Sequence, residues 1–115
     1  MKLKKVNTSN FESEVLSAAK PVLVKFTADW CQPCKSFEPL LEMVADEVAD
    51  KAIVSSLDID DSPEIASKYG VRSIPTLIVF SEGQVKSKLV GRASKENVLK
   101  LFDVIIEPLA VAIAE

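Results

Sequence analysis

The chain has 115 residues, of which 48% are hydrophobic and 27% charged, and its net charge is −3. This length suits one compact domain, the composition argues against disorder, and the charge does not point to a nucleic-acid partner. The basic N-terminus lacks the apolar stretch of a secretory signal, and no apolar run looks able to span a bilayer. We therefore expect one domain over residues 1–115, cytoplasmic and monomeric, with no membrane or nucleic-acid partner.

The first elements in the chain are predicted from capping and apolar patterns. A short strand is possible near Leu3–Val6. Ser9 and Glu12 form a capping-box signature, which predicts a helix beginning there and stopped by Pro21. The run 22–26 then reads as a buried strand that a single lysine interrupts.

The middle of the chain predicts two helices separated by a strand. Apolar residues recur at helical spacing from Cys34 to about Asp50, and Pro39 inside this pattern predicts a kink. Residues 52–59 read as a strand. Pro63 is suited to the first position of a further helix, which Gly70 would end.

The last part of the chain predicts a hairpin, a helix and a tail. Strands over 76–80 and 84–90 are joined by a tight turn. Ser94 is expected to cap a helix running to about Ile106, and residues 107–115 form an apolar extension. The whole order predicts an α/β fold: a mixed parallel and antiparallel sheet of four to five strands with helices on both faces.

The cysteines carry the strongest chemical signal. Cys31 and Cys34 are the two in the chain, which is too few for a disulfide scaffold. Without a histidine or a third cysteine, a zinc site within one chain is improbable, although a dimer bridged through two thiolates per chain could still hold a metal. Cys31 should lie at a helix N-terminus, where the dipole favours a thiolate, and Cys34 one turn further in. Cys31 would then attack a target disulfide and Cys34 would resolve the mixed disulfide. The alternative is a pair of small core residues.

Several segments carry a resemblance to a known family. The matching segments are Pro21–Phe26, Ala28–Lys35, Asp58–Asp60 and Lys68–Leu77. Trp-Cys-Gln-Pro-Cys followed about forty residues later by Ser-Ile-Pro-Thr is a specific combination. From about Phe11 to Phe102, the chain resembles the thioredoxin family.

The resemblance implies a thioredoxin fold and general reduction of protein disulfides, with electrons from a thioredoxin reductase that uses NADPH. It implies no cofactor beyond the redox-active Cys31–Cys34 disulfide. It also implies a cis peptide bond before Pro75, which would expose the Ile74 backbone to a substrate strand and deny metals access to the thiols. The substrate-binding residues it implies are Trp30, Gln32, Pro33, Ile74, Pro75, Val90 and Gly91. Trp30 and Ile74 could instead be ordinary core residues.

The chain departs from the family pattern at the site. Gln32 replaces the usual glycine, and Thr27 replaces a common second tryptophan at some cost to packing. Lys25 stands where the family has a buried aspartate below Cys34, and Ser56 where it has the partner lysine. Three roles for Lys25 remain open: a desolvated base for Cys34, a charged group that stabilises a thiolate while paired with Asp58, or a side chain that reaches the surface with no catalytic role.

Two other functions remain open at this point. One is an oxidant or isomerase of the same fold, against which the missing export signal argues. The other is a thioredoxin-like binding or chaperone module with altered redox activity, which the Lys25 replacement would favour.

Overall fold

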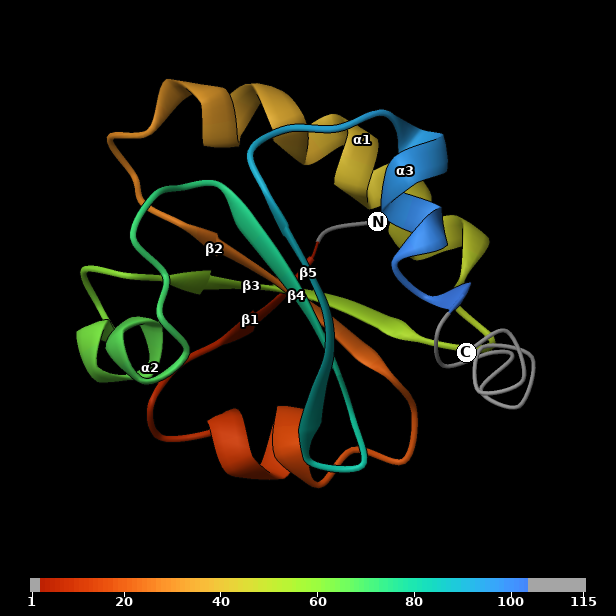
Figure 1. Cartoon of the computed structure of the whole chain (residues 1–115), viewed down its shortest axis with the longest axis horizontal. Helices are drawn as coiled ribbons and strands as arrows, with labels where there is room; N and C mark the ends of the chain where they lie inside the picture. The colour runs from red at the N-terminus through yellow and green to blue at the C-terminus, as the bar shows by residue number, and fades with distance from the viewer. Residues whose placement is uncertain (1–2, 104–115) are drawn as a thin grey trace, which may run out of the picture.

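The computed structural model describes residues 3–103, and five strands within this range form one mixed sheet. In chain order the strands are β1 (Lys4–Val6), β2 (Val22–Thr27), β3 (Ile53–Asp58), β4 (Thr76–Ser81) and β5 (Gln84–Val90). The spatial order is β1-β3-β2-β4-β5, in which β3 runs parallel to both β1 and β2, and β4 runs antiparallel to β2 and β5 (Figure 1). The predicted mixed sheet is confirmed, including its short first strand.

Within residues 3–103, four helical segments cover the two faces of this sheet. They are the π-helix η1 (Glu12–Leu16) and the α-helices α1 (Gln32–Glu47), α2 (Pro63–Lys68) and α3 (Lys95–Lys100). In Figure 1, α1 and α3 lie on one side of the sheet, and α2 and the helix between β1 and β2 lie on the other. The predicted order of elements and the two-sided α/β packing are both confirmed.

The central strand β2 shows why the sheet is covered on both faces. Leu23 packs with Phe37 and Leu41 of α1, whereas its neighbours Val22 and Val24 pack in the opposite cluster. Because successive side chains of a strand point to opposite faces, a strand that is apolar at consecutive positions needs cover on both sides. Lys25 is the charged exception within this buried strand.

The capping box predicted at Ser9 is wrong. Both the backbone N–H and the hydroxyl of Ser9 donate to Asn7 Oδ1, at 2.9 and 2.6 Å. The helix instead begins after Phe11, with no side-chain cap. The Asn7 carboxamide organises this turn, so the serine hydroxyl is engaged before it could cap a helix.

The other helix signals are largely confirmed. Ser94 Oγ accepts a hydrogen bond from Asn97 N at 3.2 Å and caps α3, and Gly70 follows α2 with a φ of +69°. Pro39 lies inside α1, which begins two residues before Cys34. The apolar extension 107–115 and the predicted end of the last helix lie outside the described residues.

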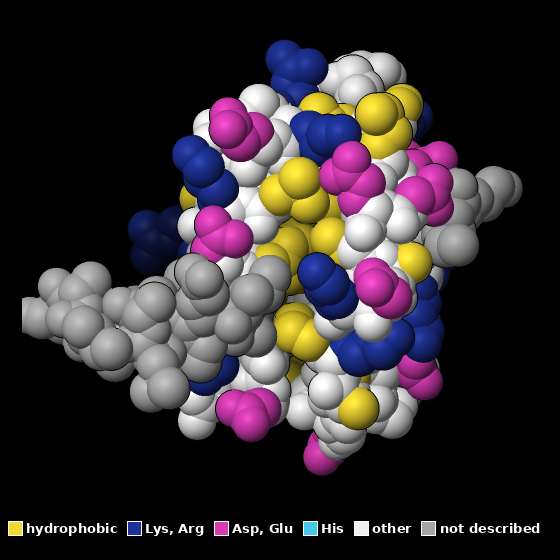
Figure 2. Space-filling view, turned by 90° about the vertical axis from the view of Figure 1, so that its right-hand side faces the viewer, with side chains coloured by type: hydrophobic (Ala, Val, Ile, Leu, Met, Phe, Trp, Pro, Cys, Tyr) yellow, Lys and Arg dark blue, Asp and Glu magenta, His cyan; other side chains and the backbone are white. Residues whose placement is uncertain are grey.

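Apolar side chains are also exposed at the end of the molecule where β2 and β3 begin. Figure 2 shows them running between basic and acidic side chains. A small pocket at the end of α1 and the start of β3 is lined by Pro21, Val48, Lys51, Ala52 and Phe102. The carboxyl ends of the parallel strands lie at the opposite end of the molecule, where the chain passes from β2 into the segment that contains the cysteines.

Candidate active site

The two cysteines lie where β2 leads into α1. Cys31 is the N-cap residue of α1, and Cys34 lies in its first turn. The two form a disulfide, with Cα atoms 5.3 Å apart, and the Cys34 backbone N–H donates to Cys31 Sγ at 3.2 Å. The predicted placement of both residues is therefore confirmed.

The surroundings of the two sulfur atoms differ. Cys31 is 4% exposed and Cys34 is 0% exposed, so Cys34 is the deeper of the two. In the reduced protein, a Cys31 thiolate would face the unpaired N–H groups and positive dipole end of α1. The first turn of α1 contains no acidic residue to oppose that charge. This arrangement favours an anionic sulfur at Cys31.

A residue from the loop that precedes β4 lies against the disulfide. Ile74 packs against a small cluster of Ala28, Cys31 and Cys34. The peptide bond between Ile74 and Pro75 is cis, as the family resemblance implied. The Gly91 N–H donates to the Pro75 carbonyl at 2.8 Å, which ties the end of β5 to this segment.

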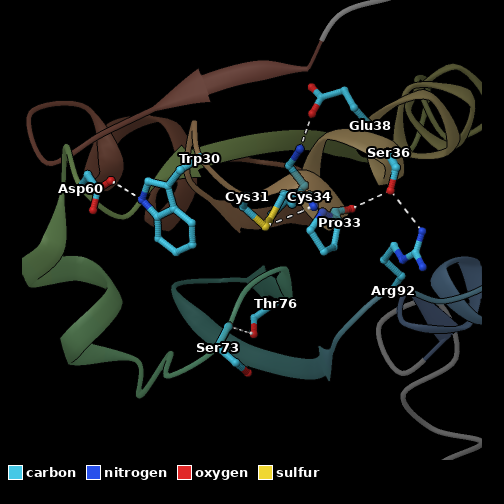
Figure 3. Close-up of a disulfide and its surroundings, with 11 residues drawn as sticks. Trp30, Cys31, Pro33, Cys34, Ser36, Glu38, Asp60, Ser73, Thr76 and Arg92 are labelled. Carbon is cyan, nitrogen blue, oxygen red and sulfur yellow. Dashed lines mark hydrogen bonds and ion pairs between the residues drawn. A yellow bond between two sulfur atoms is a disulfide. The ribbon is translucent and has the colours of Figure 1, made fainter.

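Several of the expected substrate-binding side chains are open to solvent. Val90, opposite Thr76 in the sheet, is 61% exposed. Trp30 is 65% exposed, and its indole N–H donates to Asp60 Oδ2 at 2.8 Å (Figure 3). Trp30 is therefore not a core residue. Gln32 and Pro33 are exposed as well, so an apolar and partly polar surface surrounds the disulfide.

Lys25 lies in β2, 2% exposed, and its ammonium group forms an ion pair with Glu38 of α1. The expected pairing with Asp58 is wrong, because Asp58 Oδ1 accepts the backbone N–H groups of Asp60 and Asp61 in its own loop. A side chain this buried does not match the surface alternative either. Lys25 is therefore a buried lysine that is paired with Glu38. Whether Lys25 acts as a base or as a charged group stays a prediction.

Thr27 stands beside a pocket of about 370 Å³ on the sheet face that α1 covers. Lys5, Ser56 and Asp58 are among the other residues that line it. A tryptophan, expected here from the family pattern, is far larger than threonine. The pocket agrees with the expectation that Thr27 changes packing near the site.

Sequence reasoning missed three polar residues of the site. Glu38 could have been found, because it follows Cys34 by four positions and so belongs to the same helical face as the buried Leu41. Arg92 donates to Ser36 Oγ at 3.1 Å and links the loop after β5 to α1 (Figure 3). This contact depends on the folded arrangement, and no sequence pattern indicated it.

Comparison with known proteins agrees with this geometry. The family model described as Thioredoxin matches residues 2–104. The thioredoxin of Staphylococcus epidermidis is 46% identical over 103 residues, which cover 90% of this chain and 97% of that protein. The chain belongs to the thioredoxin family. The thioredoxin of Acidithiobacillus ferridurans (43% identity; 85% of this chain, 91% of that one) and that of Mycobacterium bovis (47%; 88% of each) are further similar proteins.

Membership of the thioredoxin family, together with the Cys31–Cys34 disulfide, makes this protein a thiol–disulfide oxidoreductase. The fold, the activity and the redox-active pair expected from the sequence are thereby confirmed. Within residues 3–103, no helix is long and apolar enough to cross a membrane, and no group of three or more potential ligand side chains is placed to hold a metal.

Proposed function

We propose that this thioredoxin-family protein reduces disulfide bonds in other proteins, with Cys31 as the attacking thiol and Cys34 as the resolving thiol. The observation that carries this assignment is the position of Cys31 as N-cap of α1, with Cys34 fully buried behind it. A thiolate is the nucleophile in disulfide exchange, and the helix N-terminus favours it at Cys31.

The reaction has two exchange steps. The Cys31 thiolate attacks one sulfur of the target disulfide, forming a mixed disulfide and releasing the other target sulfur as a thiolate. Cys34 then attacks Cys31 Sγ, forms the internal disulfide and releases the second target thiol. Two electrons pass from the Cys31–Cys34 dithiol to the target.

The surface around Cys31 suits an extended segment of a protein substrate. Trp30 and Val90 supply exposed apolar side chains. Ile74 packs against the two cysteines, and Gly91, next to Val90, is hydrogen-bonded to Pro75. An exposed apolar patch of this kind is typical of a binding surface. Backbone groups beside Ile74 would pair with the substrate in the manner of an added strand.

The electron donor proposed for the oxidised protein is a thioredoxin reductase, and the compartment proposed is the cytoplasm. Disulfide-containing proteins are the proposed substrates, and a monomer is the proposed working unit. The redox-active disulfide serves without a separate cofactor in this proposal.

A trapping experiment tests the assignment of the two thiols. In insulin reduction coupled to thioredoxin reductase, Cys31→Ser and Cys34→Ser should both lose turnover. Cys34→Ser should accumulate a mixed disulfide with the target, visible by non-reducing electrophoresis and mass spectrometry, whereas Cys31→Ser should not. Trapping by the Cys31→Ser variant instead would reverse the roles, and partner binding with phenotype preserved in both variants would favour the binding-module alternative.

A further inference from the structure

The ion pair of Lys25 and Glu38 lies between the sheet and α1, behind the disulfide. Lys25 is 2% exposed and lies opposite Ser56 of β3 and Leu77 of β4 in the sheet register. The Glu38 side chain is 36% exposed, so the pair reaches from the interior to the surface. Burying a charged amine without a partner is strongly unfavourable, and an adjacent carboxylate offsets that cost. Glu38 is therefore the partner that offsets the burial of the Lys25 ammonium group.

Glu38, the acidic member of the pair, lies one helical turn beyond the resolving cysteine. Glu38 follows Cys34 by four residues in α1, and residues so spaced are neighbours on a helix, with Cβ atoms roughly 5–6 Å apart. Helical side chains also lean toward the N-terminus, which here is the end that carries Cys34. The dashed line from the Glu38 carboxylate in Figure 3 marks its ion pair with Lys25.

Other charged groups on this face of the sheet lie further along it or are otherwise engaged. Lys5 of β1 is opposite Ser56, on the far side from Lys25. Asp58, two positions beyond Ser56, accepts hydrogen bonds in its own loop. The side chains that β4 and α3 contribute to the core between the sheet and α1 are apolar, namely Leu77, Val79 and Val98. Glu38 is therefore the carboxylate that bears directly on Lys25.

We infer that Glu38 is a positioning residue for the resolving step: it holds Lys25 as an ammonium group behind Cys34, and this positive charge stabilises the Cys34 thiolate. The inference rests on the proposed role of Cys34 as the resolving thiol. Where the family pattern has a carboxylate on β2, this chain has the cation on β2 and the carboxylate on α1.

The step is an ordinary disulfide exchange. Cys34 loses its proton to solvent water, and its thiolate attacks Cys31 Sγ in the mixed disulfide. The bond between Cys31 and the target sulfur breaks as the Cys31–Cys34 bond forms. The electron pair leaves with the target thiolate. Lys25 keeps its proton throughout and acts through its charge.

Stopped-flow measurement with dithiobis(nitrobenzoate) isolates this step in the full-length protein. The reduced protein should release one nitrothiobenzoate when Cys31 is modified and a second when Cys34 closes the internal disulfide. The rate of the second phase is measured against pH for the wild type, Lys25→Met, Glu38→Gln and the double variant. Glu42→Gln is the matched control, because it removes another carboxylate of α1, one turn beyond Glu38.

Glu38→Gln should slow the second phase near neutral pH by about tenfold and move its rise to more alkaline pH, because the Lys25 ammonium is no longer held. Lys25→Met should do the same. Adding Glu38→Gln to Lys25→Met should cause no further alkaline shift, and Glu42→Gln should leave the profile unchanged.

Opposite results overturn the inference. A shift to more acidic pH in Glu38→Gln would mean that the carboxylate merely repels the thiolate, or that a neutral Lys25 acts as a base. An unchanged profile would mean that the pair is structural. If the wild type releases only one nitrothiobenzoate per protein in total, the proposed role of Cys34 fails instead. Glu38→Gln alone leaves a buried ammonium group without its partner and could fail to fold, whereas the double variant leaves no unpaired charge. In that case the pH profile of the double variant is compared with that of the wild type and of Lys25→Met.

Discussion

At the scale of single residues, the exposure of Trp30 indicates that its side chain serves the binding of a partner rather than the stability of the core. Its side chain is 65% exposed, yet a hydrogen bond to Asp60 fixes its indole beside the disulfide. A residue in the core would be buried by its neighbours, whereas Trp30 is oriented by one polar contact. Its apolar surface is therefore available to a partner.

Trp30→Ala should weaken the use of protein substrates while changing the free energy of unfolding by less than about 0.5 kcal/mol, because little of the side chain is buried. Steady-state insulin reduction should show a higher KM, and urea denaturation should show a nearly unchanged midpoint. Val85→Ala, which alters another exposed apolar side chain, is the control for a surface change away from the site. Equal effects of the two variants on KM would argue against a binding role for Trp30.

At the scale of elements, the start of a helix has two different uses in this fold. The N-terminus of α1 is occupied by Cys31, whose sulfur accepts the Cys34 N–H. The N-terminus of α3 is occupied by Ser94, whose hydroxyl accepts the Asn97 N–H. A free N–H group at a helix start needs an acceptor in both cases, and in α1 that acceptor is the reactive group.

Ser94→Ala should lower the free energy of unfolding by about 1 kcal/mol, because it removes a helix cap. Ser9→Ala is the matched comparison: the sequence pattern there resembles a cap, but its hydroxyl bonds to Asn7 outside any helix start. Urea denaturation of the two variants should show the smaller loss for Ser9→Ala. A loss at Ser9 that equals or exceeds the loss at Ser94 would contradict the assignment of the caps.

At the scale of the whole molecule, the loop after β1 is tied to α2 across a long sequence separation. The Thr8 N–H donates to Ser62 Oγ at 3.0 Å, and the Thr8 hydroxyl donates to Glu64 Oε1 at 2.7 Å. The hydroxyl hydrogen bond is the main cause that lowers the pKa of Glu64 below its ordinary value of 4.5, with a backbone hydrogen bond adding to it. Folding therefore favours the ionised carboxylate.

This lowered pKa predicts a pH-dependent contribution to stability. The contribution is present above pH 4.5, where the unfolded carboxylate is also ionised, and is lost as pH falls through the lower folded-state pKa. Thr8→Val should therefore reduce stability at neutral pH more than in strong acid, and NMR titration should show a higher Glu64 pKa. Thr8→Ser keeps a hydroxyl and should retain the low pKa. A stability difference that does not vary with pH would contradict the link.

Much of the fold follows from local patterns that tertiary contacts reinforce. The apolar run of β2 required cover on both faces, and Pro63 and Ser94 marked helix starts that the structure confirms. The signal at Ser9 was misleading, because the Asn7 side chain competes for the serine hydroxyl. Turn chemistry of this kind depends on side-chain conformations that a spacing rule does not contain.

The sequence by itself determined the class of fold, the Cys31–Cys34 pair and its place at a helix start, because these depend on periodicity and short spacing along the chain. Only the tertiary structure decided which acid meets Lys25. Asp58 and Glu38 were both compatible with the pattern of the chain. In the folded protein, Asp58 accepts a backbone N–H of its own loop, whereas Glu38 of α1 forms the ion pair with the Lys25 ammonium group. A contact between a strand and a helix depends on how the two elements pack, and that packing is a property of the folded molecule.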